Sequence, residues 1–416
     1  MASIARKNLF EDIPRFLVAQ AGIMFAVSLV TIQTGILNGF VHSTGQLIDQ
    51  SGADLWVSSK KMQQLEISPP IPLQWVTQVR AVPGVQYADP LIIRPILWQS
   101  PKGNVTSARA YGFNPKGAFF TDWRMVQGEM AKIQKPYQFV ADKANLNILE
   151  LRNLGDRGSI GALPATLVGI TQNTNSIVSG ATIFTSLETA NAYANSGVAV
   201  SCRIRDGLAE CVTSFEKSTT EPANKEQNVP QPATQLSINT PINFVLVKAN
   251  PGQDIQSLRR SIQTALPDVT VLTNEEMAQL TRGFWLRRTG VGFVLGLGAV
   301  VGFVVGVVVV SQILYASVSD HIREFGTLKA MGASDWVIYR VITEQALWMA
   351  ILGYLPSMAL CFSLGSWTMA AKGILILITP AIAGAVLGVT VVMCVGSALF
   401  AIQKVTHVDP AIVFKA

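Results

Sequence analysis

The sequence predicts an α-helical membrane protein with four transmembrane helices and a large α+β domain outside the membrane, between the first and second helices. The 416 residues are 49% hydrophobic and only 14% charged, with a mean hydropathy of +0.36, which is unusual for a soluble protein. A helix needs about 20 residues to cross about 30 Å of hydrocarbon. Four apolar runs exceed that length, at residues 16–40, 290–318, 341–371 and 373–403.

The first apolar run follows Arg6 and Lys7 and has the position of either a cleaved signal peptide or a permanent anchor. Its apolar length is about twice that of an ordinary signal core, and no small-residue cleavage site closes it. We therefore expect an anchor. Residues 1–15 before it alternate basic, acidic and apolar side chains, which predicts a cytoplasmic interfacial segment; a frayed N-terminus is the alternative.

Lys and Arg near the ends of the spans predict the orientation, because loops rich in these residues stay in the cytoplasm. Residues 1–15, the loop at residues 319–340 and the tail at residues 404–416 carry them, whereas the loop between spans three and four offers only Lys372. Both termini and the 319–340 loop are therefore expected in the cytoplasm, and residues 41–281 outside.

Three arginines just before the second span disagree with this orientation. Arg282, Arg287 and Arg288 fall on the outer side, where a large translocated domain weakens their influence on topology. With Trp285 they indicate a stalk helix that reaches the lipid headgroups, so residues 282–318 are expected to form the stalk and the second span.

The outer segment contains strand-like runs rich in β-branched and aromatic residues. A weak repeat predicts two units, each with a strand, a short helix, a proline turn (residues 82–85 and 266–269) and a second strand. Two such units sharing one sheet would bring the ends of the domain together; chance similarity is the alternative. The runs are ADLWVSS at 53–59, PLIIRPILW at 90–98, ATLVGIT at 165–171 and INFVLVKA at 242–249, and Ile255, Leu258, Ile262 and Leu266 form one helix face.

Residues 213–241 are polar and proline-rich and predict a mobile insertion, because they bury too little apolar surface to offset their ordering entropy. Cys202 and Cys211 lie on either side of an Asp-Gly turn, which favours a disulfide in an oxidising compartment. Two reduced thiols are the alternative. Cys361 and Cys394 fall in spans, where they behave as small apolar residues.

Catalytic motifs are nearly absent. The three histidines, His42, His321 and His407, are far apart, and no metalloprotease, redox, hydrolase or phosphate-loop motif is present. We therefore expect no enzyme activity, no catalytic or metal-binding residues and no cofactor, with any ATP bound elsewhere.

Glycines at four-residue spacing mark the second span. Small residues let helix backbones approach closely in lipid, so this span is expected to contact other helices on more than one side. A dimer seam and packing inside one chain are both open. The glycines are Gly292, Gly296, Gly298, Gly302 and Gly306.

The 319–340 loop predicts a short charged helix between two apolar spans. Ser319 or Asp320 can cap it and Gly332 can end it. Such a helix is either a rigid peg that contacts a cytoplasmic partner or only a connecting elbow. The candidate partner-binding residues are Ile322, Arg323, Glu324, Phe325, Leu328, Lys329 and Met331.

The run VSDHIREFGTLKAMGAS resembles the signature loop of FtsX-like and MacB-type permeases of ABC transporters. The order of one span, a large outer domain and three further spans is similar too, as is the closing DPAIVFKA. Within that group, the run from residue 302 resembles DevC-like permeases of cyanobacterial exporters, which also lack the nucleotide-binding domain fused in MacB. The resemblance implies a MacB-type periplasmic core domain between spans one and two, in a multi-pass protein of the bacterial inner (plasma) membrane.

This resemblance implies mechanotransmission, in which a separate ATPase dimer grips the cytoplasmic helices and moves the outer domains. The implied partners are an ABC ATPase subunit that binds ATP, a second permease copy, a periplasmic adaptor and an outer-membrane channel, with membrane lipids but no nucleic acid. The implied substrate is an amphiphile or glycolipid. A lipoprotein-extracting permease and an FtsX-like transducer that activates envelope hydrolases are alternatives, and neighbouring genes for a second permease or a hydrolase would favour them.

The orientation predicts the accessibility of engineered cysteines. A cysteine at Asn224, outside, should react with a membrane-impermeant maleimide on intact cells, whereas one at Ser334, inside, should react only after lysis. The reverse pattern would invert the topology.

Overall fold

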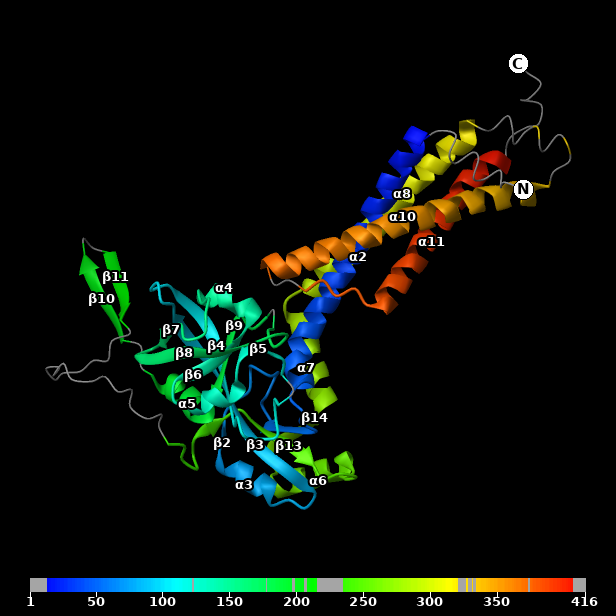
Figure 1. The fold of residues 1–416 in the computed structure, drawn as a ribbon. Coiled ribbons are helices and arrows are strands. Elements are labelled where there is room, and N and C mark those ends of the chain that lie inside the picture. The colour runs from blue at the N-terminus through cyan, green and yellow to red at the C-terminus, as the bar shows by residue number, and fades with distance from the viewer. Residues whose placement is uncertain are drawn as a thin grey trace. The chain divides into compact units, whose positions relative to one another are not determined.

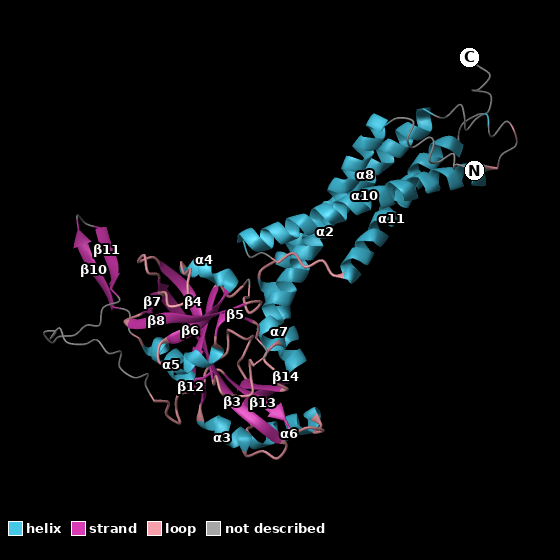
Figure 2. Ribbon diagram, in the orientation of Figure 1, coloured by secondary structure: helices cyan, strands magenta, loops and turns pink. Residues whose placement is uncertain are grey.

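The computed structural model describes residues 13–121, 123–176, 178–196, 199–205, 208–214, 235–320, 327, 331, 334–372 and 375–406. The chain divides into two compact units. Val41–Arg288 form what is called here the insert domain, and Met1–Phe40 with Thr289–Ala416 form the helix bundle. Each unit has its own hydrophobic core, and Figures 1 and 2 show the elements of both.

The predicted repeat is confirmed in the insert domain. Its first copy is β1 (Leu55–Ser59), α3 (Gln74–Arg80) and β3 (Val85–Gln99). Its second copy is β13 (Phe244–Ala249), α6 (Ile255–Ala265) and β14 (Val269–Thr273). The four strands lie in the antiparallel order β14-β1-β13-β3, so the two copies interleave in one sheet as in a ferredoxin-like fold.

Matching turns connect helix to strand in the two copies. The Val85 amide donates to the Val82 carbonyl (3.2 Å), and the Val269 amide donates to the Leu266 carbonyl (3.3 Å). Gly84 has a φ of +98°, which glycine adopts without the clash that a Cβ would cause. The predicted proline turns therefore share one backbone hydrogen bond but differ at their third residue, since Asp268 of the second turn does not have a positive φ.

Helices α3 and α6 cover one face of this four-stranded sheet (Figure 2). Leu258 and Ile262 of α6 are buried there with Leu55 and Val57 of β1. Trp56, between them in β1, is buried in the cluster on the opposite face. Since side chains alternate along a strand, β1 is covered on both faces, which explains its continuous apolar run.

The long strand β3 continues into a second half of the sheet. Its last residues pair with β4 (Val105–Phe113), and the order then runs β9, β6, β8, β5. β7 joins this half by pairing with both β3 and β8. The other bounds are β5 Met125–Gly128, β6 Gln138–Asp142, β7 Arg157–Ile160, β8 Leu163–Thr171, β9 Ala181–Ser186, the 3₁₀ turns Met130–Gln134 and Lys143–Asn145, α4 Leu146–Leu149, α5 Leu187–Asn195, and the small pair β2 Ile71–Pro72 with β12 Pro241–Ile242.

Strands β10 (Ala199–Arg205) and β11 (Leu208–Ser214) form a separate hairpin in which Cys202 and Cys211 are directly paired. Opposite residues of an antiparallel pair have Cα atoms about 4.5–5.5 Å apart, which a disulfide can bridge. The bond itself remains a prediction. Most of the predicted insertion, at residues 215–234, lies outside the described residues.

Four helices of the bundle are long and apolar enough to cross a membrane: α2 (Ile13–Asp49), α8 (Val291–Asp320), α10 (Asp335–Lys372) and α11 (Pro380–Thr406). The predicted four-span architecture with the domain between the first two spans is therefore confirmed. A shared core of α2, α8, α10 and α11 side chains joins them.

The predicted start of the fourth span, residue 373, is wrong. Helix α11 begins at Pro380, and residues 375–379 are not helical. Proline disfavours a helical conformation in the residue before it but fits the first helical position. The Thr379 hydroxyl accepts from the Ile382 amide (3.3 Å) and caps the helix, so the Thr-Pro pair was the signal that hydropathy overlooked.

The stalk forms a helix of its own, α7 (Asn274–Arg288), and the second span forms α8. Helix α7 begins before the expected residue 282 and ends before α8. Gly290, between the two helices, has a φ of +65°, the left-handed conformation common just after a helix end. The insert domain consequently extends to Arg288 rather than to residue 281.

The hairpin register predicts a linked peptide pair. Non-reducing mass spectrometry of the folded protein should detect Cys202 joined to Cys211, because the register holds their Cα atoms at bonding separation. Alkylation of both thiols before reduction, in protein prepared from an oxidising compartment, would contradict the bond.

Candidate coupling site

The two ends of the insert domain lie side by side. β1, its first strand, pairs with β14, its last, from Leu55↔Thr273 to Ser59↔Val269. The Asn274 amide then donates to the Asp54 carbonyl (3.2 Å), just beyond the last pair. Residues 45–56 and 273–282 are called the entry-exit site below, because the chain enters and leaves the domain there.

Asn274, the first residue of α7, fastens this junction through its side chain. Its Oδ1 accepts from the indole Nε1 of Trp56 (2.9 Å) and lies 3.5 Å from the hydroxyl of Ser51. Trp56 and Ser51 are fully buried. A buried donor without an acceptor costs free energy. Asn274 supplies the acceptor for the Trp56 indole N–H, which solvent does not reach.

An ion pair joins the helices on either side of the junction. Arg282 of α7 donates to the Asp49 carboxylate at the end of α2. A Cβ added at Gly45 would lie 2.5 Å from Arg282 Nε, so the guanidinium crosses α2 where a side chain is missing. Both partners keep part of their surface in solvent, which makes the pair a modest contribution to stability.

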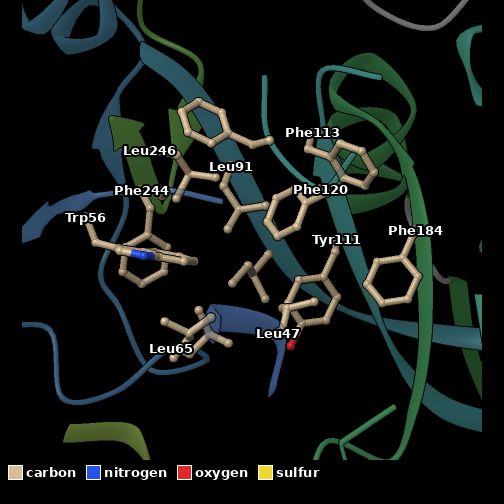
Figure 3. Packing of buried hydrophobic residues seen from close by; sticks show 14 of the residues in the cluster. Leu47, Trp56, Leu65, Leu91, Tyr111, Phe113, Phe120, Phe184, Phe244 and Leu246 are labelled. Atoms are coloured by element: carbon tan, nitrogen blue, oxygen red, sulfur yellow. The ribbon is translucent and has the colours of Figure 1, made fainter. Parts of the chain in front are cut away.

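An aromatic cluster fills the space beneath the junction (Figure 3). Trp56 and Phe244 meet edge to face with ring centroids 5.4 Å apart, and Tyr111 and Phe184 lie 5.6 Å apart on the other side. Such pairs contribute about 0.5–1.5 kcal/mol beyond burial. The cluster includes side chains from α2, α7 and both halves of the sheet, namely Leu47, Ile48, Met277, Ala278, Leu91, Leu246, Phe113, Phe120 and Val140 among others.

Glu66, in the loop after β1, connects this region to β4. Its carboxylate is almost fully buried; Oε1 accepts from the Tyr111 hydroxyl (3.0 Å), and Oε2 lies 3.0 Å from Arg109 Nε as an ion pair. Burial raises the pKa of Tyr111 well above its usual range, so the phenol stays protonated and donates. The Leu65 amide in the same loop lies 3.4 Å from its acceptor, the Thr281 hydroxyl of α7. This loop therefore ties α7 to the second half of the sheet.

A cavity beside Glu66 has a volume of about 10 Å³, enough for about one water molecule. Gln64, Thr281 and Trp285 are among its lining residues. This cavity is too small to hold an amphiphile in this conformation.

In the bundle, the predicted glycines of α8 divide into two groups. A Cβ at Gly302 would lie 3.1 Å from Leu29 of α2, and one at Gly298 would overlap Gln33 of the same helix. One at Gly306 would overlap Met393 of α11. Gly292 is half-buried, and Gly296 has nothing within 4 Å among the described residues. Packing within one chain thus accounts for three of the five glycines, and the dimer seam remains a prediction.

A second small-residue stripe, on α10, was missed in the sequence. Gly353, Ser357 and Cys361 follow one another at four-residue spacing and face α2. Ser357 Oγ lies 3.5 Å from the Met24 carbonyl, and Cys361 Sγ lies 3.8 Å from that of Ser28. The sequence signal is the pattern G-x-x-x-S-x-x-x-C, in which small residues other than glycine also permit close approach of two helices.

The contacts also give the helix directions. Gln20 and Ser28 of α2 meet Gly353 and Cys361 of α10 in ascending order, so these helices run parallel. The contacts of α2 with α8 run in descending order, so those helices are antiparallel. The directions of α2, α8 and α10 therefore alternate along the chain, as they do when successive helices cross one membrane.

The predicted cytoplasmic peg lies almost entirely outside the described residues. Only Met331 among its candidate residues is described; it is exposed and its amide donates to the Thr327 carbonyl (2.9 Å), one helical turn back. The roles of Ile322, Arg323, Glu324, Phe325, Leu328 and Lys329 remain predictions.

Comparison with known families agrees with this architecture. Residues 16–265 match the MacB-like periplasmic core domain, and residues 296–410 match the FtsX-like permease C-terminal region. The first match alone covers more than half of the chain. The chain therefore belongs to the MacB/FtsX type of ABC transporter permeases, a family whose membership implies an ATPase partner subunit.

Relatives carry similar descriptions. An uncharacterized ABC transporter permease of Mycobacterium tuberculosis is 22% identical over 401 residues, 95% of this chain and 94% of the relative. One of Methanocaldococcus jannaschii is 28% identical over 124 residues, 28% of this chain and 30% of the relative. The periplasmic region of MacB from Actinobacillus actinomycetemcomitans aligns with a TM-score of 0.35 at 12% identity, covering 56% of this chain and 94% of that one.

Replacing Asn274 tests the junction. Asn274→Ala leaves the buried Trp56 indole without its acceptor, at a cost of about 1–3 kcal/mol. The melting temperature of the full chain in detergent should fall, by about 2–4 °C per kcal/mol for a domain of this size. Asn274→Asp keeps an acceptor and should lose less. Equal losses in the two variants would show that the side-chain hydrogen bond contributes little.

Proposed function

We propose that this chain is the non-catalytic permease subunit of an ABC exporter. In this proposal, ATP hydrolysis on a separate ATPase subunit is coupled to movements of the insert domain, and these movements drive export of an amphiphile or glycolipid by mechanotransmission. The observation that carries the proposal is the pairing of β1 with β14. This pairing places the end of α2 beside α7 at one edge of the sheet, where Arg282 contacts Asp49.

The pairing supports coupling for a mechanical reason. Both connections of the insert domain to the rest of the chain pass through neighbouring strands that share a continuous hydrogen-bond ladder. A relative shift of the end of α2 and the start of α7 would act on the sheet, because residues 50–54 alone separate α2 from β1 and α7 follows β14 directly. The ladder, the Asn274 bonds and the Arg282–Asp49 pair would resist separation and pass the movement to the aromatic cluster.

The proposal gives the chain no cofactor of its own, because the sequence lacks a phosphate-binding loop and ATP belongs to the ATPase subunit. A second permease copy, a periplasmic adaptor and an outer-membrane channel complete the proposed assembly. The proposed location is a bacterial inner membrane with both termini in the cytoplasm, which is supported by the alternating helix directions and by the basic cytoplasmic segments.

Truncating the proposed peg tests the coupling. Phe325→Ala and Leu328→Ala should each remove about 2–4 kcal/mol of contact if these side chains are buried anchors in the ATPase. Association should then weaken about tenfold for each ~1.4 kcal/mol. Co-purification of the ATPase and ATP-driven export are the measurements.

Val126→Ala, an exposed position of the insert domain, is the matched control and should retain the ATPase. Normal membrane levels of all variants would show that the substitutions spare folding. Unchanged ATPase binding in Phe325→Ala and Leu328→Ala would reduce the loop to a connecting elbow and move the coupling role elsewhere.

A further inference from the structure

Residues 375–379 (LILIT), between α10 and α11, lie against α2 without forming a helix; they are called the strap below. The Leu377 amide donates to the Gly35 carbonyl (3.0 Å). Asn38 Nδ2 donates to the Leu377 carbonyl at 3.4 Å, a long hydrogen bond. One residue of the strap, Leu377, is thus held by α2 through both its backbone N–H and its carbonyl group.

Three glycines form the surface on which the strap lies. A Cβ at Gly39 would overlap the Leu375 carbonyl oxygen, so only glycine permits the observed approach. A Cβ at Gly35 would lie 2.7 Å from the Ile376 side chain, and one at Gly365 of α10 would lie 3.6 Å from Ile376 Cβ. Ile376 therefore packs against glycines of both α2 and α10.

The strap can move without unwinding the helix that follows it. Thr379 closes the first turn of α11 by itself, since its hydroxyl accepts from the Ile382 amide (3.3 Å) and its carbonyl accepts from the Ala383 amide (2.9 Å). Pro380 supplies a first helical residue that needs no hydrogen-bond acceptor. The N-terminal end of α11 therefore keeps its hydrogen bonds to Thr379 whether or not residues 375–378 lie against α2.

The strap connects α2 to the hairpin of α10 and α11. Helix α2 is continuous from Ile13 to Asp49 and leads directly into the insert domain. Any displacement of α2 along its axis relative to α10 and α11 must carry the strap with it or pass it. Two hydrogen bonds join the strap to α2, and Gly35 and Gly39 have no side chain that the strap would have to pass.

We propose that the strap is a releasable latch that is seated on Gly35 and Gly39 in the resting transporter and leaves that seat when ATP drives α2 past the α10–α11 hairpin. The inference rests on the proposed coupling to an ATPase. It assigns Asn38, Gly39 and Leu377 a role in holding one state of the cycle.

A reversible cross-link tests the latch. The variant with Asn38→Cys and Leu377→Cys is reconstituted in lipid nanodiscs with the co-purifying ATPase, and each single variant is the control. Oxidation should join the two cysteines without nucleotide and should do so about tenfold less after trapping with ATP and vanadate. The locked complex should lose ATP turnover, and dithiothreitol should return it to the level of the single variants.

Dithiothreitol must leave the activity of the unaltered chain unchanged, which controls for Cys202 and Cys211. Cross-linking that is equal in both nucleotide states, with full turnover in the locked complex, would overturn the latch. The coupling proposal would stand in that case if the unaltered complex still responds to ATP. A chain that binds no ATPase at all would overturn both proposals.

A glycine pair offers an independent test. Gly39→Ala places a methyl group against the Leu375 carbonyl and should lower the nucleotide-free cross-linking of the cysteine pair about tenfold. Gly384→Ala, in α11, meets nothing within 4 Å among the described residues and should leave cross-linking unchanged. If both substitutions behave alike, the seat on Gly39 does not hold the strap.

Discussion

The antiparallel pairing of β1 with β14 is the contact on which the insert domain depends. It closes the longest loop of the domain, and the entropic cost of that closure grows only slowly with loop length. Once β1 and β14 are joined, β13 pairs with the other edge of β1, and β3 pairs with β13. The second half of the sheet, which lies between β3 and β13 in the chain, continues beyond β3. The same pairing places the end of α2 beside the start of α7. A single ladder thus determines where force could enter the domain.

Packing in the bundle follows a different physical rule, because apolar side chains gain little by leaving lipid for one another. Close approach of backbones is what remains, and it requires small residues where helices cross. Helix α2 is contacted by glycines of α8, by the small-residue stripe of α10 and by the strap. Gln20 shows the cost of this arrangement, since both atoms of its buried carboxamide lack a partner among the described residues.

Much of the insert domain was predictable because its elements follow their local rules. The β-branched runs became β1, β3, β8 and β13, and the apolar face of α6 was buried as its spacing predicted. The approach of the two ends of the domain followed from the repeat, but the side-chain contacts of the entry-exit site did not, since Asn274 and Trp56 are separated by most of the domain and neither belongs to a motif. Only the register of β1 on β14 brings them within hydrogen-bond distance.

The sequence by itself determined the number of membrane spans, the position of the inserted domain and its duplicated unit, because hydropathy and periodicity depend on near neighbours in the chain. Tertiary structure alone decided which glycines have a neighbouring segment packed against them and which part of α2 the segment before α11 contacts. It also decided which polar groups meet where β1 pairs with β14. Those outcomes depend on contacts between residues far apart in the chain. Gly35 and Gly39 have the four-residue spacing of helix-packing glycines, yet their neighbour is the non-helical strap, because any backbone that can reach a glycine can approach it closely.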